Sequence, residues 1–158
     1  MPNQKSVNAA FANASRVVAK QIKTYLAGID REVAARGYRV SNQLRNSALY
    51  VLRGERSGRR YLVPDTKRYY TASAPGESPA NRLGIFRLSW TTRVDAQKSG
   101  KLYTVRSLIE SNVKAGAYLL GDMLEKGTKK MAARPYKQKV IDRALPKIME
   151  IYNRPYKP

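Results

Sequence analysis

The 158-residue chain predicts a single domain of the α+β class. Apolar residues recur with a helical period towards both ends, and two adjoining segments in the second half have the composition of β-strands. A long segment between the N-terminal helical region and these strands, residues 53–84, has neither pattern. We therefore expect N-terminal helices, a long extended arm, an antiparallel β-hairpin or small sheet, and two C-terminal helices, all within residues 1–158.

Residues 14–35 predict an amphipathic helix, because apolar residues recur there at steps of three and four: Val18, Ile22, Tyr25, Leu26, Ile29 and Val33. Gly37 is expected to end this helix, since glycine is common just past a helix C-terminus. A second helical stripe follows and reaches Gly54; its members are Val40, Leu44, Ala48, Val51 and Leu52. One helix with a break and an antiparallel pair of helices both fit this pattern.

Residues 53–84 are rich in Gly, Pro and Ser and form a long excursion for a compact domain. Loops of this length are usually functional or become ordered against a partner, so we expect an arm. Two short strand-like runs, 61–63 and 69–71, flank the turn signal Pro64-Asp65. Pro75-Gly76 marks a second turn.

Basic and aromatic residues alternate irregularly in the first half of this arm. Basic side chains hold phosphates, and tyrosines stack on bases or pack at protein interfaces. The arm is therefore a candidate contact with DNA or with a neighbouring subunit, through Arg56, Arg59, Arg60, Arg68, Tyr61, Tyr69 and Tyr70. The alternative is a solvated loop whose tyrosines belong to the core.

Residues 85–113 predict an antiparallel β-hairpin. In residues 85–94 apolar and polar residues alternate, as in a half-buried strand, and the apolar set is Phe86, Leu88 and Trp90. Residues 102–113 are rich in β-branched and aromatic residues. The intervening sequence DAQKSGK supplies a turn at Gly100.

Residues 117–126 and 135–152 predict two helices joined by a rigid corner. Gly127 stops the first helix and fits a left-handed conformation, where a side chain would be strained. Thr128 can hydrogen-bond locally, and Pro135 suits the first turn of the second helix. The corner displays three basic residues at a fixed place: Lys129, Lys130 and Arg134. Of these, Lys129 and Lys130 are candidate contacts with DNA or with a neighbouring subunit.

The last helix carries one apolar stripe, made of Ile141, Ala144, Leu145, Ile148 and Tyr152. Pro146 lies inside this run and is expected to kink the helix or to start a new segment, because it lacks an N–H and crowds the preceding turn. The tail, residues 153–158, is expected to be loose or docked on a neighbour.

The residue inventory argues against catalysis. The chain has no cysteine and no histidine, so it lacks thiolate ligands, the commonest general base and the commonest zinc ligand. Asp122 and Glu125 stand at i and i+3 and could share a cation, but an ordinary helix surface near Lys126 and Lys129 is the favoured interpretation. No phosphate-binding loop and no GxSxG motif occurs. We expect no enzymatic activity, no cofactor and no metal.

Charge is the strongest compositional signal. The chain has 31 Lys and Arg against 11 Asp and Glu, which gives a net charge of +20. A field of this sign attracts polyanions, so DNA, RNA or acidic surfaces in an assembly are the candidate partners. No apolar run approaches the roughly 20 residues of a membrane span, and the start has no apolar core of a secretory signal. We expect a soluble, intracellular protein without a membrane contact.

Two segments carry recognisable motifs. ASAPGESPANRLGIFRLSW, residues 72–90, is similar to Pro-Gly-Glu-x-Pro-Ala followed by Gly-x-Leu-Arg-x-Ser. AYLLGDMLEKGTKKMAARPYKQKV, residues 117–140, is similar to Tyr-x-x-x-x-Glu-x-Gly-Thr, a short basic stretch with Met, and then Arg-Pro-Phe opening a helix. In this order and spacing, residues 72–152 resemble the neck, or head–tail joining, proteins of long-tailed bacteriophages, which are also described as minor tail or phage morphogenesis proteins.

The first family motif falls on Pro75, Gly76, Glu77, Pro79, Ala80, Gly84, Arg87 and Ser89. The second falls on Tyr118, Glu125, Gly127, Thr128, Met131, Arg134 and Pro135. The chain departs from the pattern at three positions, with Leu83 in place of Thr, Phe86 in place of an aliphatic residue and Tyr136 in place of Phe, and Tyr118 stands further from Glu125 than in a common version of the motif.

The resemblance implies an α+β subunit that forms a ring with copies of itself in the neck of the virion. Its other partners would be head-completion or adaptor proteins and the tail terminator or tube proteins, with DNA passing through the channel. It would be assembled in the host cytoplasm, and no enzymatic activity carries over from the family. The alternative function is that of a basic nucleic-acid-binding protein with a helix-plus-hairpin fold.

Overall fold

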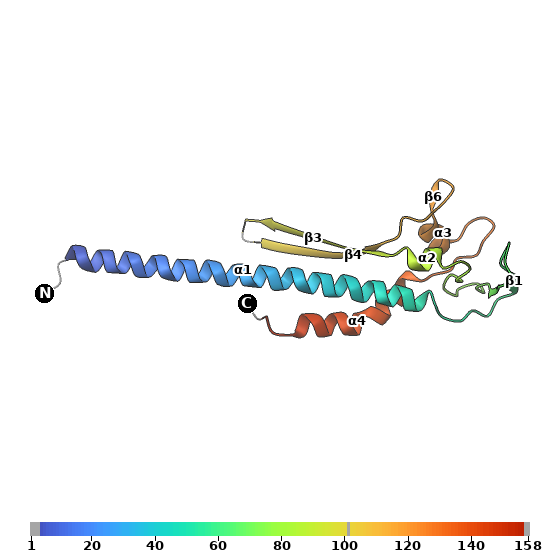
Figure 1. Cartoon of the computed structure of the whole chain (residues 1–158), viewed down its shortest axis with the longest axis horizontal. Helices are drawn as coiled ribbons and strands as arrows, with labels where there is room; N and C mark the ends of the chain where they lie inside the picture. Colours follow the sequence, from blue (N-terminus) through green and yellow to red (C-terminus); the bar gives the residue numbers. More distant parts are fainter. Residues whose placement is uncertain (1–3, 101, 157–158) are drawn as a thin grey trace.

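The computed structural model describes residues 4–100 and 102–156 and confirms the α+β class. A long helix runs along most of the molecule, with a two-stranded hairpin along one side and a shorter helix along the other (Figure 1). In chain order the elements are α1 (Gln4–Val51), β1 (Arg60–Leu62), β2 (Tyr69–Thr71), α2 (Ile85–Leu88), β3 (Thr91–Ser99), β4 (Leu102–Glu110), β5 (Lys114–Ala115), β6 (Tyr118–Leu119), α3 (Leu120–Lys126) and α4 (Lys137–Asn153).

The N-terminal part of the chain, Gln4–Val51, is one unbroken helix of 48 residues, so the expected break at Gly37 and the antiparallel pair are wrong. Gly37 is buried where the β3–β4 hairpin crosses α1, and a Cβ there would lie 2.4 Å from Cγ1 of Val105. The Ser107 hydroxyl donates a hydrogen bond to the Gly37 carbonyl at 2.9 Å. Glycine is present because the hairpin approaches the helix backbone closely, and the helix continues through it.

The hairpin is antiparallel, from Thr91 opposite Glu110 to Ser99 opposite Leu102, and its turn has Gly100 at φ 59°. The predicted pairing and the turn glycine are therefore confirmed. The predicted first strand begins too early, because residues 85–88 form the short helix α2. Its start is set by Gly84, which is left-handed at φ 80°.

The core lies at the C-terminal end of α1. It contains Ala48 and Leu52 of α1, Trp90 from the segment before β3, and Tyr136 and Val140 from the start of α4. Phe86, Trp90 and Tyr136 meet edge to face, with ring centroids 5.5 to 5.9 Å apart. Phe86 and Trp90 stand four residues apart, and the turn of α2 brings both rings to Tyr136, which explains why a helix replaces the predicted strand here.

The last helix also departs from expectation in its first turn and its tail. α4 begins at Lys137, so Pro135 lies outside it, and it continues through Pro146 to Asn153 without starting a new segment. Beyond it, the Arg36 guanidinium donates hydrogen bonds to the carbonyls of Tyr152 at 3.1 Å and Pro155 at 2.8 Å. The tail thus contacts α1 of its own chain through the Pro155 carbonyl. Residues 157 and 158 of the predicted tail lie outside the described range.

The short helix α3 begins three residues later than predicted. Residues 114–119 form a tight β5–β6 hairpin around Gly116, whose φ is 63°, and Leu120 opens the helix directly after it. Tyr118 sits in β6 and is 70% exposed. Among the described residues, no helix combines the length and the apolar content that crossing a bilayer requires.

Candidate functional site

The residues of the first motif form a closed loop held by Glu77. Its carboxylate accepts hydrogen bonds from the Ser57 hydroxyl at 2.6 Å, from the Ala74 N–H at 2.9 Å and from the Ser57 N–H at 3.1 Å. These bonds, with that of the Ser57 hydroxyl the largest, lower the pKa of Glu77 to about 2. Gly76 has a φ of 78°, as the predicted turn requires. Glu77 is thus the residue that ties the turn to the start of the arm.

The Arg56 side chain holds the arm together from within. Its guanidinium donates hydrogen bonds to the carbonyls of Pro79 at 2.9 and 3.2 Å, of Val51 at 2.9 Å and of Gly54 at 2.6 Å. Burial lowers the pKa of Arg56. The chain's own carbonyl oxygens already accept the hydrogen bonds that Arg56 can donate. We therefore keep only the exposed arginines of the arm as candidate contacts for DNA.

The two motifs, far apart in sequence, meet in space. The Gly76 N–H donates to the Ala133 carbonyl at 3.3 Å, and the Ser78 hydroxyl donates to the Pro135 carbonyl at 3.4 Å. Arg134 donates to the Ser73 carbonyl. A pocket of about 430 Å³ is walled by both motifs, and its lining includes Pro79, Gly84, Arg87, Met131 and Arg134. The motif residues therefore build one structural unit.

The corner between α3 and α4 turns at Gly127 and is held by backbone hydrogen bonds. Gly127 has a φ of 76°, and its ψ of −178° places it outside the left-handed helical region, in a conformation that essentially only glycine adopts. Its N–H donates to the Met123 carbonyl at 2.9 Å. Thr128 and Met131 then exchange backbone hydrogen bonds of 2.8 and 3.2 Å. This small loop carries Lys129 and Lys130 exposed at its tip.

Asp122 and Glu125 each have a partner within the chain. Glu125 accepts hydrogen bonds from the N–H groups of Tyr136 at 2.9 Å and Lys137 at 3.2 Å. Asp122 forms an ion pair with the Lys137 ammonium at 3.1 Å. Within residues 4–100 and 102–156, no group of three or more potential ligands could hold a metal ion. The two carboxylates position the start of α4.

The β1–β2 hairpin displays the basic and aromatic residues of the arm. Tyr61 and Tyr70 stack with their ring centroids 5.9 Å apart, and the Arg60 guanidinium lies 4.6 Å from the centre of the Tyr69 ring. Tyr61 is 44% and Tyr69 58% exposed, so these two rings lie outside the core, whereas Tyr70 is half-buried. Arg59 and Arg68 are exposed on the same hairpin. This surface has the chemistry of a phosphate and ring contact.

The remaining predicted residues have local roles. Ser89 donates to the Phe86 carbonyl at 2.9 Å and its hydroxyl lies 2.6 Å from that of Ser111, so it ties α2 to the end of the hairpin. Arg87 has a buried Nε without a hydrogen-bond partner among the described residues. Arg36 was not predicted as a site residue, although an arginine on an otherwise apolar stripe of α1 is a signal for a buried contact.

Comparison of the chain with protein-family models, with curated proteins and with solved structures finds no significant match in any of the three.

Proposed function

We propose that this chain is a structural subunit of the bacteriophage neck, which joins the DNA-filled head to the tail as part of a ring. The observation that carries the proposal is the contact between the two motifs, through the bonds from Gly76 to Ala133 and from Ser78 to Pro135. Because the two motifs pack together in one folded unit, their joint resemblance to neck proteins supports the proposal.

The fold has features that suit an assembly component. The described chain leaves long apolar and basic surfaces uncovered, and its motif carboxylates Glu77 and Glu125 are engaged in holding loops and helix ends. In the proposed role the partners are further copies of the chain, head-completion or adaptor proteins, and tail terminator or tube proteins. The protein acts in the virion after assembly in the host cytoplasm.

A lysate of phage that lacks this protein tests the proposal. We expect electron microscopy to show DNA-filled heads and separate tails, and infectivity to return when the wild-type chain is supplied in trans. Joined, infectious particles in the absence of the protein would contradict the neck assignment.

The exposed β1–β2 hairpin favours a second candidate function, binding of nucleic acid. Replacing Arg59, Arg60 and Arg68 with Gln removes three exposed cations beside the tyrosine rings. We expect weaker binding of short DNA and a smaller dependence of the affinity on salt, because fewer counterions are released. The matched control carries the same change of charge on α1, at Lys20, Lys23 and Arg31. If both triple variants lose affinity equally, net charge rather than the hairpin accounts for binding.

A further inference from the structure

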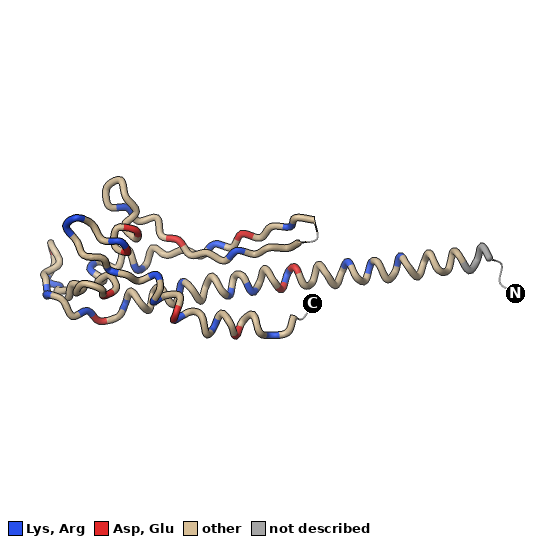
Figure 2. The backbone as a smooth tube through the Cα atoms, turned by 180° about the vertical axis from the view of Figure 1, so that it is seen from behind, with Lys and Arg blue, Asp and Glu red and all other residues tan. Residues whose placement is uncertain are grey.

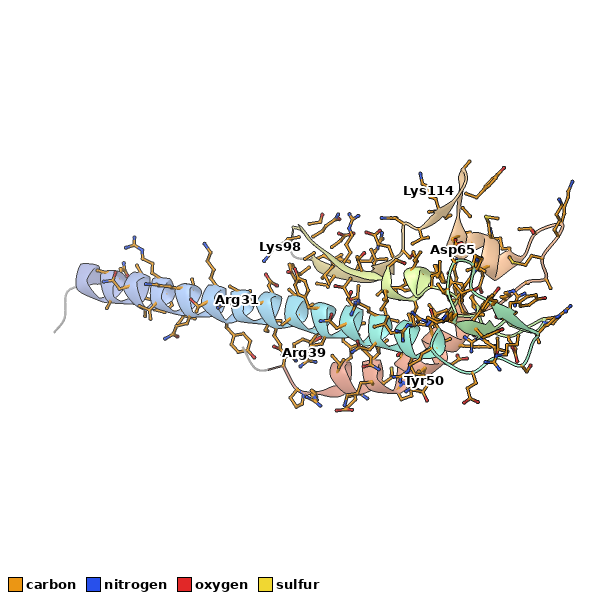
Figure 3. The ribbon with its side chains drawn as sticks, turned by 45° about the vertical axis from the view of Figure 1, so that its right-hand side comes forward. Arg31, Arg39, Tyr50, Asp65, Lys98 and Lys114 are labelled. Atoms are coloured by element: carbon orange, nitrogen blue, oxygen red, sulfur yellow. The ribbon has the colours of Figure 1, made fainter. Side chains whose placement is uncertain are left out.

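The pocket that the two motifs enclose, of about 430 Å³, lies at the C-terminal end of α1, where Figure 3 shows side chains of the arm, α2 and α3 crowded together. Its volume falls within the range of about 300 to 1,000 Å³ that is usual for small-molecule sites. Leu52, Phe86 and Leu124 line it, and the same three side chains belong to the core or pack against it. The apolar part of the wall is therefore already formed in the single chain.

The pocket carries positive charge. Three arginines line it, Arg82, Arg87 and Arg134, and no carboxylate of the described residues does. Within residues 4–100 and 102–156 the arginines that form ion pairs are others, namely Arg36, Arg39, Arg93 and Arg154. Lys and Arg outnumber Asp and Glu in the whole chain, 31 to 11 (Figure 2). The charge of the pocket is therefore not neutralised by an ion pair within the described chain.

The carboxylates of the two motifs that build the pocket already have partners. Glu77 accepts its hydrogen bonds from Ser57 and from a backbone N–H of its own loop. Glu125 accepts its hydrogen bonds from the N–H groups of Tyr136 and Lys137. Either carboxylate would have to give up these bonds in order to pair with an arginine of the pocket. The anion that suits the pocket is therefore one that binds from outside.

Arg87 and Arg134 are less exposed than ordinary surface arginines, because both are half-buried in the pocket wall. An outer nitrogen of the Arg134 guanidinium donates a hydrogen bond to the Ser73 carbonyl, which holds this side chain in place. The Nε of Arg87 is buried and has no hydrogen-bond partner among the described residues. A guanidinium that leaves water without finding acceptors raises the free energy of the folded chain, and an anion bound to it offsets that cost.

The chemistry of the wall selects the class of ligand. A guanidinium matches the planar carboxylate group, which can accept two parallel hydrogen bonds from it. The apolar side chains beside the arginines favour a ligand that also has an apolar body. A phosphate monoester, which carries about −1.5 to −2 charges at pH 7, loses more hydration against apolar side chains than a carboxylate does. An aliphatic carboxylate therefore suits both parts of the wall.

We propose that this pocket binds a free aliphatic carboxylic acid in its ionised form. The carboxylate accepts hydrogen bonds from the guanidinium groups of Arg87 and Arg134, and the hydrocarbon chain packs on Phe86 and Leu124. A free acid is favoured over an acidic side chain of a partner protein, because the cavity is formed within one chain and has the size of a small-molecule site. Such a site goes beyond the neck function and does not depend on it.

Octanoate is the probe that tests this site. We expect its titration into the isotope-labelled full chain at neutral pH to shift the NMR signal of the Arg87 Nε–H saturably, with a Kd of about 1 mM or lower. Arg87→Gln identifies this signal by its loss and should raise the Kd, followed on the amide of Leu124, at least about tenfold. Arg106→Gln makes the same change of charge at an exposed position of β4 outside the pocket and should leave the Kd unchanged.

Further probes separate the two parts of the wall, and they use the wild-type chain alone, so the folding of a variant does not enter. Octanol has the same hydrocarbon chain without the charge and should bind at least about tenfold more weakly than octanoate. Hexanoate lacks two CH₂ groups and should bind up to about tenfold more weakly. Octanol that binds as tightly as octanoate would overturn the proposal, and so would displacement of octanoate by an equal concentration of inorganic phosphate.

Thermal melting separates a ligand-binding role of Arg87 from a structural one. Arg87→Met removes an unpaired polar group and keeps most of the side-chain volume, so we expect this variant to melt at or above the wild-type temperature without ligand. Octanoate should raise the Tm of the wild type but not that of the variant. A ligand-free variant that melts several degrees below the wild type would show that Arg87 stabilises the fold itself, and its assignment to the ligand would be wrong.

The peptide acetyl-Leu-Glu-Leu-amide tests the other source of the same chemistry, an acidic side chain beside apolar residues. We expect it to bind more weakly than octanoate, because its backbone polar groups would lose water in the cavity. Tighter binding of the peptide would overturn the assignment to a free acid and point to a segment of a partner protein. The absence of any saturable shift with octanoate at concentrations up to about 10 mM would overturn the site altogether.

Discussion

The carboxylate of Glu125 lies 2.9 Å from the backbone nitrogen of Tyr136, from which it accepts a hydrogen bond. It also accepts one from the N–H of Lys137, the first residue of α4, whose N-cap residue Tyr136 supplies no side-chain cap of its own. The last turn of α3 therefore caps α4 across the corner. Burial, together with the charges of Glu125 and Asp122, raises the pKa of the Tyr136 hydroxyl, so that ring stays neutral in the core.

Removal of this cap should be measurable. We expect Glu125→Ala to lower the free energy of unfolding by about 1 kcal/mol, the usual cost of losing an N-cap acceptor. Asp122→Ala, one turn earlier on α3, breaks an exposed ion pair and should cost less than about 0.5 kcal/mol. Urea denaturation at neutral pH compares the two variants, and equal losses would show that general charge rather than capping is responsible.

Gly127 should tolerate no β-branched residue. A Cβ there would lie 2.7 Å from the Ala133 nitrogen and 2.8 Å from the Met131 carbonyl oxygen, and its φ of 76° adds backbone strain. We expect Gly127→Val to destabilise the fold by on the order of 2 kcal/mol or more. Lys126→Ala changes an exposed helix residue and should stay within about 0.5 kcal/mol of the wild type. Thermal melts that coincide for the two variants would contradict the proposed requirement for glycine at this corner.

Glu77 should make the free energy of unfolding depend on pH in the acidic range. Its pKa in the folded state is lowered to about 2 from an ordinary value of 4.5, so its contribution is complete above the ordinary value and is lost as the pH falls towards 2. We expect the urea midpoint of the wild type to exceed that of Glu77→Gln at pH 6, and the gap to narrow at about pH 3. Glu55→Gln, an exposed carboxylate nearby, controls for net charge. A gap of constant size at both pH values would refute the loop role of Glu77.

Gly37 should resist replacement even by a better helix former. Alanine is favoured over glycine in a helix by about 1 kcal/mol, but overpacking against the Cγ1 of Val105 costs about 1 to 3 kcal/mol. We expect Gly37→Ala to be destabilising by net about 1 kcal/mol. In a double-mutant cycle measured by urea denaturation, Val105→Ala should relieve part of this loss, since it removes the clashing methyl groups. Additive effects of the two changes would show that the hairpin does not determine this glycine.

Local chemistry made several features predictable from the sequence. Gly100 and Gly127 were placed correctly, because positive φ angles favour glycine; Asp65 is the one described residue of another type that has a positive φ. Composition alone singled out the tyrosines and arginines of the arm, but it did not separate the exposed Tyr61 and Tyr69 from the half-buried Tyr70 or from Arg56, which is bonded to the chain's own carbonyls. The contact between the two motifs, through Gly76, Ser78 and Arg134, was not predicted, since contacts between distant segments leave no periodic signal.

The errors share a tertiary cause. A glycine in a sequence looks the same whether it ends a helix or lets a hairpin pack closely against one. At position 37, only the approach of Val105 decides between these two roles. Phe86, Leu88 and Trp90 alternate like a strand, yet Phe86 and Trp90 are also one helical turn apart, and the Tyr136 ring selects the helix. Periodicity over a few residues cannot separate such alternatives.

The position of the core has a consequence for synthesis on the ribosome. The whole of α1 emerges first, but the core around Ala48 and Leu52 is complete only when Tyr136 and Val140 emerge, near the end of translation. The exposed apolar residues of α1 before Gly28, such as Phe11 and Ile22, are not covered by any described element even in the folded chain. A nascent chain therefore carries its apolar helix faces uncovered for most of its elongation, when molecular chaperones and premature encounters between chains compete for them.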